Sequence, residues 1–107
     1  MPEEAIIVYC TFPDADAARN AARTLVEQRL AACASILPGV ESIYRWKGAI
    51  ETASEVLLLI KTTSGKYQML ETRILALHPY EVPEIVSVRI DAGNPPYLHW
   101  IGENVTG

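Results

Sequence analysis

The sequence has little of what marks several functional classes. Its nine basic residues are scattered from Arg19 to Arg89 and the formal net charge is -4, which argues against a surface for nucleic-acid phosphates. No apolar stretch approaches the roughly 20 residues of a membrane helix, and no secretory leader is recognised. We therefore expect a cytoplasmic protein that binds neither nucleic acid nor membrane.

Catalytic motifs and dedicated metal-binding motifs are also missing. The chain has no Gly-x-Ser-x-Gly elbow, no glycine-rich phosphate loop, no Cys-x-x-Cys, no His-x-x-x-His and no acidic calcium loop. The remaining carboxylates, which include Glu51, Glu55, Glu81 and Glu84, are interpreted as solvated charges at hairpin and helix ends. We do not expect an enzyme.

What is present favours one small hydrophobic core. Of 107 residues, 50% are hydrophobic and 21% charged, and no repeat, low-complexity tract or linker interrupts them. Residues 1–107 are therefore expected to form a single domain. Cys10 and Cys33 lie in apolar surroundings, and in a reducing compartment both are expected to be free thiols.

The first segments read as a strand and a helix. The run from Ala5 to Phe12 is apolar and β-prone without alternation, which is typical of a strand buried on both faces. Pro13 ends that run, and Asp14 offers an N-cap for a helix whose apolar stripe continues to about Leu30.

From 34 to 62 the apolar residues recur with period two, which predicts a long β-hairpin. Pro38-Gly39 interrupts its first arm, and Lys47-Gly48 is the expected reversal point. The first arm alternates between apolar and polar residues, whereas 56–60 in the second arm is apolar on both sides. Only the second arm is expected to be central in a sheet.

The last third of the chain predicts helix, strand and helix. Thr63 or Ser64 caps a helix that ends before Pro79, and its apolar stripe comprises Tyr67, Leu70, Ile74 and Leu77. A strand is expected from Glu84 to Asp91. Asn94, followed by two prolines, then begins a short terminal helix.

The order β-α-β-β-α-β plus a terminal helix predicts an α+β fold of the split βαβ, or ferredoxin-like, type. Right-handed crossovers place both main helices on one face of an antiparallel sheet, with the first and third strands in the middle. Those two strands are the ones that lack alternation, so their outward side chains are apolar as well. Because a soluble monomer tolerates only a small apolar patch, we expect a homo-oligomer that covers this face.

Five segments carry a resemblance to a known family: Val8-Tyr9-Cys10-Thr11-Phe12-Pro13-Asp14, Leu30-Ala31-Ala32-Cys33-Ala34, Tyr44-Arg45-Trp46-Lys47-Gly48, Leu59-Ile60-Lys61-Thr62 and His78-Pro79-Tyr80-Glu81-Val82-Pro83-Glu84. In these segments the chain resembles the CutA family, the divalent-cation tolerance proteins. The resemblance implies a ferredoxin-like subunit in a tight homotrimer, similar in outline to the PII signal proteins, with a role in copper tolerance and copper binding.

Cys10 and His78 are the candidate metal ligands, because thiolate and imidazole suit copper. The resemblance implies a copper site with a cysteine at the position of Cys10 and two adjacent histidines before Pro-Tyr. Leu77 occupies the first of those two positions here. We therefore expect copper or another divalent cation to bind weakly or at sites between subunits. Two structural interpretations stay open: a helix C-terminal role for His78 and a small buried hydrophobe at Cys10.

A second hypothesis is a small-molecule sensor similar to PII, with its site in a cleft between subunits. Tyr44 and Trp46 at the hairpin tip of one subunit would approach Tyr80 and Glu84 of another, and Lys61 would pair with Glu84. The alternative is that Trp46 and Tyr80 are anchors of the trimer, because tyrosine and tryptophan are favoured at protein interfaces for their area.

A third hypothesis is a rigid trimeric scaffold for a partner protein. The terminal helix carries Tyr97 and Trp100, residue types that are favoured at protein interfaces. This hypothesis predicts a protein that is indifferent to metal.

Overall fold

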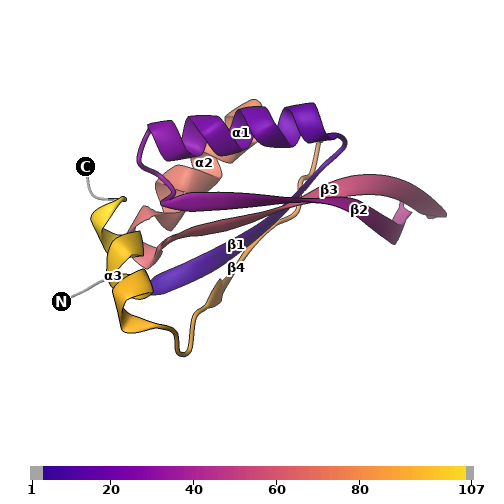
Figure 1. Cartoon of the computed structure of the whole chain (residues 1–107). Helices are drawn as coiled ribbons and strands as arrows, with labels where there is room; N and C mark the ends of the chain where they lie inside the picture. Colours follow the sequence, from indigo (N-terminus) through magenta and orange to yellow (C-terminus); the bar gives the residue numbers. More distant parts are fainter. Residues whose placement is uncertain (1–3, 106–107) are drawn as a thin grey trace.

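The computed structural model describes residues 4–105, which form one four-stranded antiparallel sheet and three α-helices (Figure 1). In chain order the elements are β1 (Ala5–Phe12), α1 (Ala15–Glu27), β2 (Cys33–Trp46), β3 (Ala49–Thr63), a 3-10 turn (Ser64–Lys66), α2 (Tyr67–Leu77), β4 (Ile85–Arg89) and α3 (Pro95–Glu103). The strand order is β2-β3-β1-β4, and α1 and α2 both cover one face of the sheet. The predicted ferredoxin-like α+β fold is confirmed, with the first and third strands in the middle.

The hydrophobic core lies between the helices and the sheet. The side chains of alternate residues on β1 and β3 point toward the helices, so Val8 pairs with Ile60 and Cys10 with Leu58. Helix α1 contributes mainly alanines to this core, and α2 contributes Leu70 and Ile74. The buried set is Ile6, Val8, Cys10, Phe12, Ala18, Ala21, Ala22, Leu25, Leu30, Ala31, Val56, Leu58, Ile60, Leu70 and Ile74.

Helix α1 begins as predicted and ends early. Asp14 has an extended backbone, and its carboxylate accepts the Ala17 amide hydrogen over 2.8 Å. The helix ends at Glu27, so the predicted end near Leu30 is wrong. Arg29 adopts a left-handed conformation, with φ 59°, and the following amides fold back to the Leu25 carbonyl.

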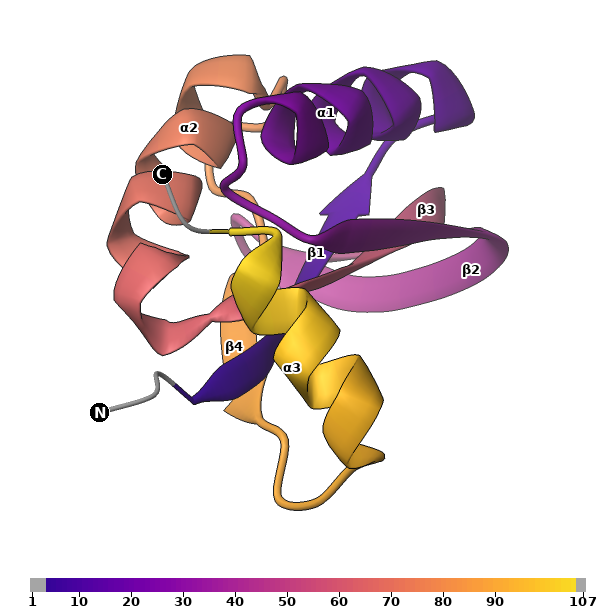
Figure 2. The same cartoon turned by 60° about the vertical axis from the view of Figure 1, so that its left-hand side comes forward.

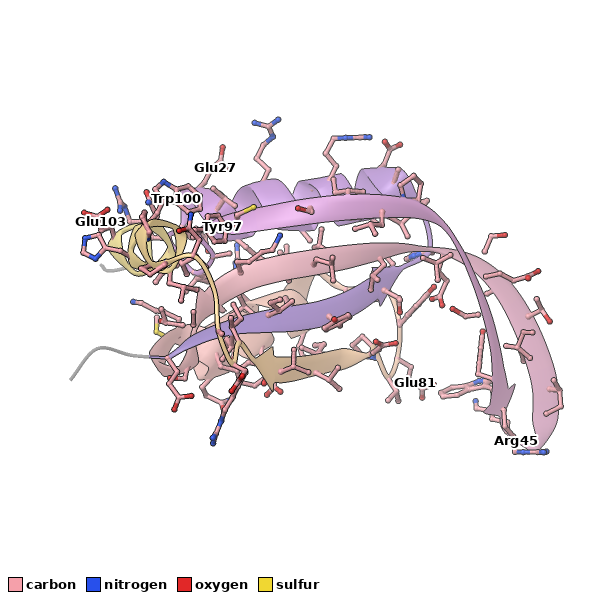
Figure 3. All side chains as sticks on the ribbon, turned by 60° about the horizontal axis from the view of Figure 1, so that its bottom comes forward. Glu27, Arg45, Glu81, Tyr97, Trp100 and Glu103 are labelled. Carbon is pink, nitrogen blue, oxygen red and sulfur yellow. The ribbon has the colours of Figure 1, made fainter. Side chains whose placement is uncertain are left out.

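The β2–β3 hairpin turns at the predicted place. Lys47 and Gly48 have φ angles of 50° and 85°, the left-handed pair that a two-residue reversal requires. The strand register shifts between Leu37 and Val40, where Gly39 has φ 83°. Beyond this irregularity the two arms pair only with each other, and the ribbon curves toward the loop that carries Glu81 (Figure 3).

The predicted stop before Pro79 is confirmed, because α2 ends at Leu77 and His78 is its extended C-cap residue. Strand β4 spans only Ile85–Arg89, so the predicted range of Glu84 to Asp91 is too long. The reason is that β4 is an edge strand, whose only partner is the stretch of β1 from Ile6 to Cys10.

The face of the sheet opposite α1 and α2, here called the open face, is apolar as expected. Its apolar side chains are Ile7 and Tyr9 on β1, Leu37 on β2, Leu57 and Leu59 on β3, and Val86 and Val88 on β4. Val86 is 51% and Val88 45% exposed. Among the helices of the described residues only α3 lies over this face, at one end, where its Ile101 packs with Ala32 and Val105 (Figure 2).

Candidate functional site

A cavity of about 670 Å³ opens between the curved β2–β3 ribbon and the loop that follows α2. Three aromatic side chains and three carboxylates share its lining: Tyr44, Trp46 and Tyr80, with Glu55, Glu81 and Glu84. In the described part of the chain no lysine, arginine or histidine lines it. The cavity, called the acidic pocket below, is therefore a negatively charged site with aromatic walls.

His78 fixes one wall of the acidic pocket to the sheet. Its Nδ1 accepts the Tyr80 amide hydrogen over 3.1 Å, so Nε2 carries the ring proton and donates it to the Thr11 carbonyl over 2.7 Å. The ring stacks on Phe12 with centroids 4.3 Å apart. Burial lowers the pKa of His78, against the smaller opposing effects of the Thr11 hydrogen bond and the Glu55 charge. A neutral imidazole therefore ties the loop to β1.

Glu55 and Tyr80 meet at the inner end of the pocket. The Tyr80 hydroxyl donates to Oε2 of Glu55 over 2.7 Å, and Glu55 is only 8% exposed. Burial, followed by the hydrogen bond and charge of Glu55, raises the pKa of Tyr80, so the phenol keeps its proton. The prediction that Glu55 is a solvated charge is wrong, because the loop after α2 brings the Tyr80 hydroxyl against its carboxylate. Sequence periodicity held no signal for this burial.

Four of the five predicted cleft residues lie together. Tyr44, Trp46, Tyr80 and Glu84 line the acidic pocket, and one chain supplies all of them. Lys61 lies elsewhere and donates to the Ser35 hydroxyl over 3.2 Å.

The predicted pair of Lys61 with Glu84 is wrong because of the sheet register. Lys61 is paired with Ile7, whereas Ile85, which follows Glu84, is paired with Cys10. The two positions are thus separated by roughly 10 Å or more along β1.

The two predicted metal ligands, Cys10 and His78, lie in different surroundings. Cys10 is fully buried on the helix-facing side of β1, and burial, with the nearby charges of Glu84 and Glu55, raises the pKa of its thiol to about 12. Both ring nitrogens of His78 already have hydrogen-bond partners. Among residues 4–105 no cluster of three or more His, Cys, Asp or Glu side chains is arranged to hold a metal ion.

The terminal helix presents its aromatic residues at the surface. The rings of Tyr97 and Trp100 stack with centroids 5.7 Å apart, and each residue is 40% exposed. No helix in the described range is both long and apolar enough to cross a membrane.

Fold and pocket together define a class: a small ferredoxin-like domain with an apolar open sheet face and a pocket lined by acidic and aromatic residues. Residues 6–104 match the family model described as CutA1 divalent ion tolerance protein. The chain therefore belongs to the CutA1 divalent ion tolerance family, which confirms the resemblance seen in the sequence.

Relatives of known sequence support this membership. The divalent-cation tolerance protein CutA of Thermus thermophilus is 51% identical over 98 residues, which cover 92% of this chain and 95% of that protein. A CutA homolog of Xenopus laevis is 50% identical over 91% of this chain, but the matched part is 64% of that protein, and for the mouse CutA protein it is 57%. The chain thus spans less than two thirds of these vertebrate relatives.

Solved structures agree with the fold. The divalent cation tolerance protein of Thermus thermophilus superposes with a TM-score of 0.93 at 49% identity, covering 95% of this chain and 99% of that one. A structure described as the periplasmic divalent cation tolerance protein CutA of Archaeoglobus fulgidus gives a TM-score of 0.92 at 35% identity, with the same coverage.

Proposed function

We propose that the chain is the subunit of a homotrimeric, non-catalytic protein of copper tolerance that acts in the cytoplasm. The observation that carries the assembly is the open face, where Val86 and Val88 remain about half exposed beside the half-buried Leu57 and Leu59. Apolar surface of this kind is covered in soluble proteins by association, at about 25 cal/mol per Å² buried. The number three follows from the family resemblance.

Size-exclusion chromatography with light scattering tests the assembly. The wild-type chain should give about three times its mass of 11.8 kDa. Val88→Asp places a charge on the open face and should lower the mass of the particle. Leu75→Asp is the matched control, because Leu75 is 53% exposed on α2, on the other side of the sheet. A wild-type particle of 11.8 kDa, or equal masses for both variants, would contradict the proposal.

For the metal, we propose weak copper binding through Cys10 and His78 or at sites between subunits. Binding at Cys10 requires loss of a thiol proton that burial retains, and binding at His78 requires loss of one ring hydrogen bond. Both costs reduce affinity, which supports weak binding.

Calorimetric titration with copper tests these ligands. Cys10→Ser and His78→Ala should each weaken binding, whereas His99→Ala, a change at an exposed histidine on α3, should not. Unchanged affinity in both Cys10→Ser and His78→Ala would remove the two residues as ligands.

The acidic pocket supports a second candidate function, a small-molecule sensor similar in outline to the PII proteins. Its volume of about 670 Å³ falls within the range of ligand sites, and its aromatic walls with a few polar groups are the usual composition of such sites. The residues known to line the pocket all come from one chain.

A further inference from the structure

The acidic pocket contains a largely buried carboxylate with one oxygen available to a ligand. Glu55 is 8% exposed, and its only hydrogen-bond partner among residues 4–105 is the uncharged hydroxyl of Tyr80, which contacts Oε2. Its other oxygen, Oε1, is not among the buried side-chain atoms of the described residues that lack a hydrogen-bond partner, so it is accessible from the cavity. No cationic side chain of residues 4–105 lies within salt-bridge distance of Glu55. A carboxylate oxygen that faces a cavity can accept a hydrogen bond from a cationic ligand, and such a charge-assisted bond is stronger than a neutral one.

The rest of the lining indicates what kind of cation fits. Glu81 and Glu84 add two exposed carboxylates to the same cavity. The faces of Tyr44 and Tyr80 can attract positive charge. The Trp46 ring already has the Lys47 ammonium 5.6 Å from its centroid, and it offers apolar surface to methylene groups. A cavity of about 670 Å³ is also far larger than a bare metal ion requires.

The three carboxylates line one cavity without converging on one point. No group of three acidic, histidine or cysteine side chains in the described range is close enough together to hold a metal ion. Separated negative charges with aromatic surface between them match a flexible ligand whose positive charges are also separated. A compact divalent ion does not have that shape.

We propose that the acidic pocket binds an aliphatic polyamine, with one ammonium group donating to Glu55 and a second group near Glu81 and Glu84. The methylene chain lies against the aromatic walls. This proposal rests on the sensor function of the pocket, and it does not depend on copper binding.

Isothermal titration of the wild-type protein with spermidine tests the proposal at physiological salt, with 1,8-octanediol as an uncharged chain of similar length. We expect saturable binding of spermidine, about one per chain, and none of the diol. Glu55→Gln keeps the shape and an acceptor for Tyr80, and it should weaken binding at least tenfold, since a charged hydrogen bond is lost. Glu41→Gln is the matched control, because it removes the same charge from an exposed site on β2 outside the pocket. It should change affinity less than twofold.

Further variants keep the test decisive if Glu55→Gln does not fold. Glu84 and Trp46 are exposed positions, so Glu84→Gln and Trp46→Leu should leave the fold intact and each weaken binding a few-fold. Absence of spermidine binding to the wild type would overturn the proposal, as would equal losses in Glu41→Gln and the pocket variants.

Light scattering and copper titration on the same samples separate this proposal from the others. A protein that assembles and binds copper but ignores spermidine refutes only the ligand. A protein that binds spermidine as a monomer, or without copper affinity, refutes only the assembly or the metal.

Discussion

His78 connects the loop after α2 to the central strand, and its removal should loosen both. His78→Ala deletes the hydrogen bonds to the Thr11 carbonyl and from the Tyr80 amide, and it deletes the ring stacked on Phe12. Two hydrogen bonds contribute about 2 kcal/mol and the stacking contributes about 1 kcal/mol. We expect the free energy of unfolding to fall by about 3 kcal/mol in urea titrations at fixed protein concentration.

The pH dependence gives an independent readout of the same residue. The pKa of His78 is lower in the folded protein than its usual 6.5, so the unfolded chain binds the proton more tightly. Its contribution to stability is complete above about pH 6.5 and is lost as the pH falls through the lower folded pKa. Wild-type stability should therefore drop between pH 7.5 and the acidic range by an amount that the His78→Ala protein does not show.

A conservative variant separates the parts of the effect. His78→Gln keeps a side-chain amide donor able to approach the Thr11 carbonyl but has no ionisable ring, so it should recover part of the lost stability and none of the pH dependence. The reasoning is refuted if His78→Ala costs less than about 1 kcal/mol, or if the Gln variant retains the acid-dependent loss.

Three further outcomes follow from single contacts. Asp14→Ala removes the carboxylate that accepts the Ala17 amide hydrogen and should lower the free energy of unfolding, measured in urea, by about 1 kcal/mol. An unchanged free energy of unfolding would show that this cap does not stabilise the helix. Gly48→Ala places a residue with a side chain at a backbone φ of 85° and should lower the free energy of unfolding by about 1 to 2 kcal/mol, seen as a lower midpoint in thermal melts. An unchanged midpoint would mean that the turn adopts another conformation. In the native protein Cys10 should resist iodoacetamide at pH 8, because its thiol is buried and burial raises its pKa to about 12. Mass spectrometry of the labelled peptide should find Cys10 modified only after the protein is unfolded. Rapid labelling of the native protein would refute the burial.

The order and type of the elements could be predicted because local signals agreed with the fold. Pro79, the Lys47-Gly48 pair and the Asp14 cap mark real boundaries, and the apolar runs mark the two central strands. The end of α1 was missed because the left-handed residue there is Arg29, not the glycine that usually signals a helix end.

Only part of the site could be predicted, because its geometry depends on the direction in which the β2–β3 ribbon bends. Sequence located the interruption at Pro38-Gly39 but not the direction in which the ribbon turns beyond it. That direction brings Tyr44 and Trp46 into one pocket with Glu55 and with Tyr80 of the loop after α2. The misplacement of Lys61 has a similar origin, because strand ends alone do not give the register.

The strand order has a consequence for how the chain matures on the ribosome. Strand β1 is made first, yet its two neighbours are β3, which ends at Thr63, and β4, which ends at Arg89. Until the chain up to Thr63 has been made, the nascent polypeptide therefore carries an apolar segment without its full central-strand partner, and this exposes it to aggregation. In a translation system depleted of chaperones, a larger fraction of this protein should therefore aggregate than of a protein whose first strand pairs with the next strand made.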